Sequence, residues 1–143
     1  MGTWGTGPFD SDGAEDLLDE LAGHTIERRL EVVTRLLVSA IDAGGGADAS
    51  VQPEEVVATA AVVAAGVPAG RHLPWNDDWD GLERWLPQPI SADLAALAVR
   101  ALEVAVPAGG WFWRSWVDAG EQEEARAAIN EIKAVLATVS DGG

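Results

Sequence analysis

Residues 53–68 read Pro-Glu-Glu-Val-Val-Ala-Thr-Ala-Ala-Val-Val-Ala-Ala-Gly-Val-Pro. Proline suits the first turn of a helix, and the two glutamates that follow it complement the positive end of the helix dipole. Gly66 and Pro68 together form a stop signal. Because nearly every residue between these signals is Ala or Val, the segment has no polar side, which is typical of a helix at the centre of a domain. Valine also favours strands, so a buried strand over 56–65 is the alternative.

The segments before this stretch carry helix start signals followed by apolar residues at helical spacing. Asp12 and Glu15 match a capping box, and Gly23 is placed to end that short helix in the left-handed conformation. Thr25 is placed to cap a second helix that runs to about Ala43. The predicted inward faces of the two helices are Leu17, Leu18 and Leu21, then Ile26, Leu30, Val33, Leu37 and Ile41.

Two further helices are predicted after the central stretch. Ser91 is placed to cap one of them, and Asp118 with Glu121 forms a capping box for the other. Their predicted inward faces are Leu94, Leu97, Ala98, Ala101, Leu102 and Ala105, then Ala125, Ile129, Ile132, Leu136 and Val139. On the second helix, Glu31 and Arg35 are spaced for a weak ion pair.

The connection over residues 67–90 is too long to be a featureless loop in a compact domain. Asp77 or Asp78 could cap a short helix there, ending near Leu86. The apolar residues at helical spacing in this connection are Trp75, Trp79, Leu82 and Leu86.

These patterns predict an all-α fold: a single compact bundle of about five helices, with residues 1–143 forming one domain. The Ala/Val helix lies at its centre. The glycine-rich N-terminal segment cannot form a regular helix or strand, and Trp4 and Phe9 are too apolar to stay in water. We therefore expect that segment to pack across one end of the bundle.

The composition narrows the functional classes. The formal net charge of −15 repels phosphate backbones, so we expect no nucleic-acid partner and consider a basic protein partner instead. The chain has no cysteine and shows no signal sequence, which favours the cytoplasm. Its longest apolar run, 56–67, is shorter than the ~20 residues of a membrane span.

Two stretches hold candidate binding residues. Residues 71–80 combine an arginine, a histidine, two tryptophans and three carboxylates, a set that could bind a metal or act as an acid–base pair. Residues 111–116 hold four aromatic rings beside an arginine, the residue types that dominate protein interfaces. The candidates are Arg71, His72, Trp75, Asp77, Asp78 and Asp80 in the first stretch, and Trp111, Trp113, Arg114 and Trp116 in the second.

No motif for a serine hydrolase, a phosphate-binding loop or a zinc protease occurs in the chain. The sequence therefore favours a non-enzymatic protein-interaction module. The most specific version of this hypothesis is an immunity- or inhibitor-like role against a basic toxin or nuclease. We expect no cofactor and no metal. The alternative is a small enzyme or ligand-binding protein that uses His72 with Asp77, Asp78 or Asp80. The oligomeric state stays open.

The N-terminal block resembles a bacterial family known as domain of unknown function 4259. The residues that carry this resemblance are Gly2, Trp4, Gly5, Gly7, Pro8, Phe9, Asp10, Asp12 and Ala14. The resemblance implies a small stand-alone bacterial protein. It implies no catalytic residue, because the family has no established activity.

Overall fold

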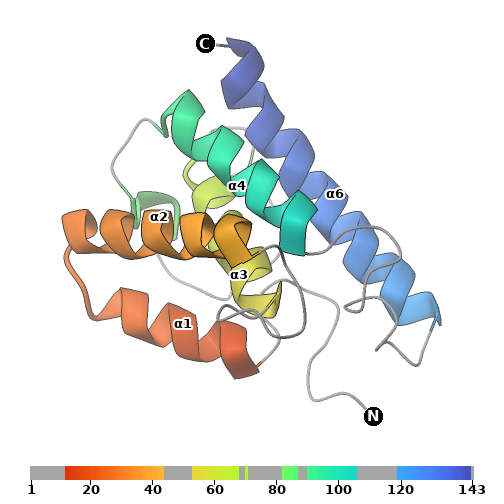
Figure 1. Ribbon diagram of the computed structural model, residues 1–143, viewed down its shortest axis with the longest axis horizontal. Helices are drawn as coiled ribbons and strands as arrows, with labels where there is room; N and C mark the ends of the chain where they lie inside the picture. The colour runs from red at the N-terminus through yellow and green to blue at the C-terminus, as the bar shows by residue number, and fades with distance from the viewer. Residues whose placement is uncertain are drawn as a thin grey trace.

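The computed structural model describes residues 12–43, 53–67, 70, 82–86, 90–105 and 119–142. Over these residues the fold is an all-α bundle without strands, as predicted (Figure 1). Its elements are α1 (Asp12–Ala22), α2 (Ile26–Ala43), α3 (Pro53–Ala65), the 3-10 turn η3 (Leu82–Arg84), α4 (Ala92–Ala105) and α6 (Ala119–Gly142). None of these helices combines the length and the apolar character needed to cross a bilayer.

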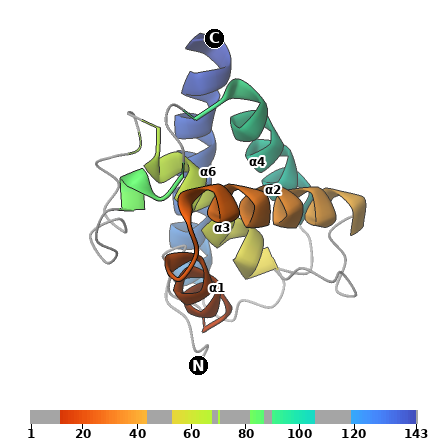
Figure 2. The ribbon, with the colours of Figure 1, turned by 90° about the vertical axis from the view of Figure 1, so that its left-hand side faces the viewer.

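Helix α3 is the centre of the bundle, as its all-apolar sequence predicts. It packs against α1, α2, α4, α6 and η3, and Figure 2 shows it between α1 and α2 on one side and α6 on the other. Residues 56–67 are all buried. The strand alternative for residues 56–65 is wrong, because these residues belong to helix α3. Their small alanine side chains let neighbouring helices pack closely against several sides of α3.

Two predicted N-caps are confirmed by hydrogen bonds. The hydroxyl of Thr25 accepts the N–H of Arg28 at 3.2 Å, at the start of α2. The hydroxyl of Ser91 accepts the N–H of Leu94 at 3.1 Å, at the start of α4. Each bond satisfies one of the N–H groups that the first helical turn leaves without a partner.

Helix α1 ends at Ala22, just before Gly23, and its last turn differs from the one predicted. The N–H of Gly23 donates to the carbonyl of Glu20 at 3.2 Å, and the N–H of His24 to that of Leu21 at 3.1 Å. Both bonds span three residues, so the helix tightens in its last turn. The φ angle of Gly23 lies outside the left-handed region, which corrects the predicted left-handed stop.

The inward face of α2 is narrower than the sequence predicts. Val33, Leu37 and Ala40 are buried, whereas Ile26 is 36% exposed. The prediction that Ile26 belongs to the inward face is wrong. Ile26 is the first residue of α2, and this end of the helix extends beyond the core (Figure 1).

The two C-terminal helices bury the faces predicted for them. Helix α4 packs against α2, α3 and α6. The predicted residues that are buried are Leu94, Ala98, Ala101, Leu102, Ile129, Ile132 and Leu136. The side chains of Ala105 and Ala125 lie outside those that the structure describes. Leu97 and Val139 are partly buried at the edge of the same core.

Gly70 marks a close approach between the end of α3 and α6. Its N–H donates to the carbonyl of Val67 at 2.8 Å. A Cβ atom at this position would overlap the carbonyl oxygen of Ala64 and lie 3.0 Å from Cγ1 of Val135. Only glycine leaves room for the chain between these two helices.

Four predictions about structure lie outside the described residues and side chains. They are the packing of the N-terminal segment through Trp4 and Phe9, the capping boxes that begin at Asp12 and at Asp118, and the short helix capped by Asp77 or Asp78.

Candidate functional site

Neither candidate stretch of the sequence falls within the described residues, so both stay predictions. The residues concerned are Arg71, His72, Trp75, Asp77, Asp78, Asp80, Trp111, Trp113, Arg114 and Trp116. Along the chain, η3 follows the first stretch. The second stretch lies between the C-terminal end of α4 and the N-terminal end of α6.

Among the described residues, polar contacts concentrate at the α1–α2 junction, which we define as residues 20–31. Its central side chain is the half-buried Arg29 of α2. The guanidinium Nε–H donates to the carbonyl of Leu21 at 2.7 Å, and Nη2–H donates to that of Ala22 at 3.2 Å. Nη1–H donates to the carbonyl of Trp85 at 3.4 Å. One side chain therefore connects α1, α2 and the segment that follows η3.

The contacts of Arg29 have a clear electrostatic cause. Helix α1 has no basic residue in its last turn, so its final carbonyls and the negative end of its dipole need a cation from elsewhere. Arg29 supplies that cation from the next helix. Its guanidinium carbon also lies 5.1 Å from the centre of the Trp85 ring, within the range of a cation–π contact.

Sequence reasoning missed both Arg29 and Trp85. The spacing of Leu82, Trp85 and Leu86 places them on one side of a helical turn, and all three are buried. That pattern could have identified Trp85. Nothing local identifies the contact of Arg29 with Trp85, because Trp85 lies 56 residues further along the chain. The other two acceptors, Leu21 and Ala22, are close in sequence, and the lack of a basic residue in the last turn of α1 is a signal that could have identified Arg29.

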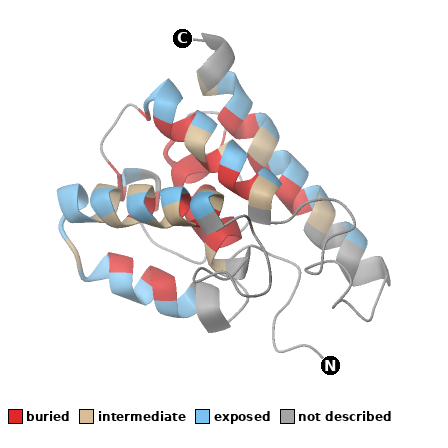
Figure 3. Ribbon diagram, viewed as in Figure 1, coloured by how far each residue is buried: buried red, intermediate tan, exposed pale blue. Residues whose placement is uncertain are grey.

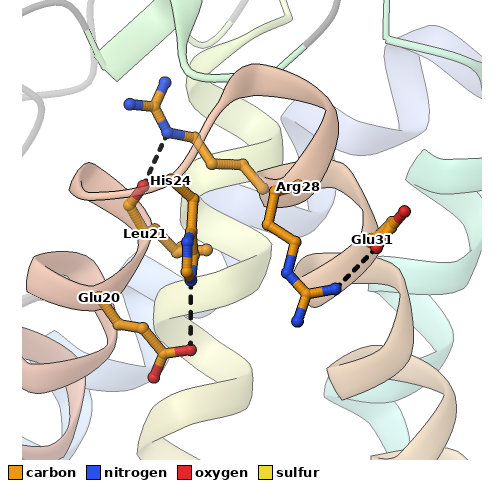
Figure 4. A network of polar contacts seen from close by, with 6 residues as sticks. Glu20, Leu21, His24, Arg28 and Glu31 are labelled. Atoms are coloured by element: carbon orange, nitrogen blue, oxygen red, sulfur yellow. Dashed lines mark hydrogen bonds and ion pairs between the residues drawn. The ribbon is translucent and has the colours of Figure 1, made fainter.

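A second set of contacts at the junction lies on the outer surface (Figure 4). Nε2 of His24 is 3.7 Å from the carboxylate of Glu20, and Nη1 of Arg28 is 2.8 Å from that of Glu31. The predicted pair of Glu31 with Arg35 is wrong, since Glu31 pairs with Arg28 instead. All of these groups are partly or largely exposed, so water and salt weaken their attraction.

The outer surface of α1 is formed by carboxylates. Glu15, Asp16, Asp19 and Glu20 are exposed, and their spacing places them on one side of the helix. We call these four residues the α1 acidic face. The opposite side carries Leu17, Leu18 and Leu21, which are buried in the core, so red and pale blue alternate along α1 in Figure 3. No lysine or arginine occurs on α1.

The described part of the chain shows no candidate metal centre. Within it, no three His, Asp or Glu side chains come together in a way that could hold a metal ion. Thr59 is the one buried polar side chain in that part, and its hydroxyl donates to the carbonyl of Glu55 at 2.7 Å. That hydrogen bond occupies the hydroxyl within α3.

A comparison with models of protein families matches residues 2–128 to the family described as Domain of unknown function (DUF4259). The chain belongs to this family. The match confirms the family named from the sequence and covers most of the chain. No curated protein and no solved structure matches the sequence. The family description assigns no reaction, so the chemistry of the described surface carries the functional argument.

Proposed function

We propose that this DUF4259 protein is a non-enzymatic interaction module whose α1 acidic face binds a basic surface of a partner protein. The observation that carries the proposal is the one-sided charge of α1. Its exposed side presents four carboxylates, and the helix contains no basic residue to neutralise them.

The charge of the whole chain supports the same partner. A net charge of −15 attracts a basic surface at long range and speeds the encounter, whereas it repels nucleic acid. Of the four carboxylates, only Glu20 lies near a basic side chain of the described residues, and that side chain, His24, is charged only when it is protonated. The remaining three are available to lysine or arginine from a partner.

A basic nuclease or toxin fits this chemistry. Enzymes that act on nucleic acid present a positive surface to the phosphate backbone. A row of carboxylates along a helix imitates that backbone in charge, so binding through α1 would block the substrate surface of such a partner. The proposed role is therefore inhibitor-like.

The test compares two triple variants that each remove three negative charges. The first, E15Q/D16N/D19N, changes the α1 acidic face. The control, E103Q/E123Q/E131Q, changes exposed carboxylates of α4 and α6. The probe is a lysine-rich peptide without an apolar face, and its affinity is measured by titration calorimetry at several salt concentrations.

We expect the α1 variant to bind the peptide about tenfold more weakly, since three exposed ion pairs contribute about 0.5 kcal/mol each. The affinity of the control for the peptide should fall less than about threefold. The control retains the carboxylates of α1 and removes only charges far from it, whose attraction is screened by salt. Equal losses in the two variants would mean that net charge alone attracts the peptide and that α1 is not a binding face.

A further inference from the structure

Helix α1 is held to the rest of the bundle by two kinds of contact. Its apolar side, which carries Leu17, Leu18 and Leu21, is buried, and its main packing partner among the described helices is α3. The carbonyls of Leu21 and Ala22 at its end accept hydrogen bonds from the guanidinium of Arg29. Both kinds of contact must break before α1 can leave the bundle.

Taken alone, α1 is a weak helix. It has eleven residues, and an isolated helix of that length is marginal in water. Glu15 and Asp19 lie four residues apart, as do Asp16 and Glu20, so like charges are neighbours along its outer side. The helix contains no basic residue to offset them. Its folded state therefore depends on its contacts with the rest of the chain, and a weaker contact makes its opening easier.

The guanidinium of Arg29 is itself held by the segment 82–86. Its Nη1–H donates to the carbonyl of Trp85 in a long bond of 3.4 Å, and its carbon lies 5.1 Å from the centre of the Trp85 ring. The side chains of Leu82, Trp85 and Leu86 are buried, which fixes this segment on the bundle. An arginine side chain loses rotamer freedom when it is ordered. Because Trp85 already restricts Arg29, α1 gains more by closing on this guanidinium than by closing on a free one.

We propose that Arg29 is a latch through which the segment 82–86 controls the opening of α1. When α1 is closed, one planar group connects the two. When Trp85 moves away, Arg29 can still bond to the carbonyls of α1, but it has lost its fixed position, so α1 opens more often. The segment follows residues 71–80 along the chain, and a displacement of the segment would reach α1 by this route. The latch acts on the fold of α1, so it does not depend on the proposed function.

The test is hydrogen exchange of backbone amides, which measures how often each part of the chain opens. The amides of residues 18–24 report on α1, and those of α3 report on the centre of the bundle. The variants are R29A, W85L and R29A/W85L. The controls are R28A, which removes an exposed arginine from the same helix, and L82A, which shortens a buried side chain of the same segment but removes no partner of Arg29.

In the native protein we expect the α1 amides to exchange faster than those of α3, because α1 opens without unfolding of the whole bundle. R29A should raise α1 exchange at least about thirtyfold, through the loss of hydrogen bonds to a charged group. W85L should raise it about fivefold, which corresponds to the loss of the cation–π contact. R28A should change it less than about twofold, as expected for an exposed ion pair, and so should L82A.

The double variant is decisive. Without Arg29 the segment 82–86 has no route to α1, so R29A/W85L should show the same α1 exchange as R29A alone. An effect of W85L that persists in the absence of Arg29 would mean that Trp85 acts on α1 by another path, and the latch would be wrong. Unchanged α1 exchange in W85L would overturn it too, as would equal exchange of α1 and α3 in the native protein.

The comparison survives if R29A/W85L does not fold. R29K then takes the place of R29A, because an ammonium group cannot donate to both segments from one planar fork. W85L should change α1 exchange less than about twofold in the R29K background, and a full fivefold change there would contradict the latch. No peptide is present in these measurements, so the latch and the proposed function can each fail alone.

Discussion

Arg28 and Arg29 are neighbours of the same residue type, yet their surroundings give them different roles. Arg28 pairs on the surface with Glu31, where the two side chains are 47% and 61% exposed. Arg29 is half-buried and donates to carbonyls from two other segments of the chain. A hydrogen bond to a charged group contributes more when water is kept away from it, whereas an exposed ion pair contributes little.

We therefore expect Arg29→Ala to lower the free energy of unfolding by about 2 to 4 kcal/mol, through lost hydrogen bonds and the lost contact with the Trp85 ring. Arg29→Lys should recover less than half of this loss, because an ammonium group cannot reproduce the planar fork of donors. Arg28→Ala, the matched control, should cost less than about 0.5 kcal/mol. Urea unfolding measures all three variants. Similar costs for Arg28→Ala and Arg29→Ala would contradict the role assigned to Arg29.

At the scale of elements, local signals explain which predictions succeeded. The caps at Thr25 and Ser91 act on amides three residues away, so short sequence patterns identify them. The central position of α3 follows from its lack of a polar side. The structural features that the sequence did not predict depend on where helices end and on how they pack. The exposure of Ile26 is set by where the core stops, and the contact of Arg29 with Trp85 is set by tertiary packing. Neither is encoded in the neighbouring sequence.

Gly70 and Gly23 give opposite predictions for the effect of an added methyl group on stability. At Gly70 a methyl group would overlap the carbonyl of Ala64, between α3 and α6. Since that atom belongs to the backbone, it cannot move aside as a flexible side chain could. We expect Gly70→Ala to cost about 3 kcal/mol of stability, measured by thermal or urea unfolding.

The matched control for Gly70→Ala is Gly23→Ala, a glycine at a helix end where an added methyl group has room. The added Cβ would meet the carbonyl oxygens of Glu20 and Asp19 at 3.6 and 4.0 Å, which is ordinary contact. Because the φ angle of Gly23 lies outside the left-handed region, alanine should raise stability by about 0.5 kcal/mol by restricting the unfolded chain. A loss of more than about 1 kcal/mol would instead support the left-handed stop predicted from the sequence.

For the whole molecule, the sequence indicated the kind of surface but not its arrangement. The charge of −15 follows directly from composition. The gathering of Glu15, Asp16 and Asp19 on one side of α1 follows from helical spacing once Leu17 and Leu18 are known to face the core. Helical spacing leaves Val38 outside the predicted inward face of α2, but the fraction of this side chain that stays exposed depends on the neighbouring helices.

Because this charge is concentrated on a small surface, repulsion between carboxylates should limit the stability of the folded state. We expect the free energy of unfolding to rise by about 1 kcal/mol as sodium chloride increases from about 10 mM to about 150 mM, because the screening length falls from about 30 Å to about 8 Å. Urea unfolding at each salt concentration measures the effect. The variant E103Q/E123Q/E131Q, with three fewer charges on other helices, should be more stable than the native protein at low salt and should respond less to added salt. A native stability that falls with salt would show that attractive pairs such as Arg28–Glu31 outweigh the repulsion, and the acidic surface would then be largely neutralised within the chain rather than available to a partner.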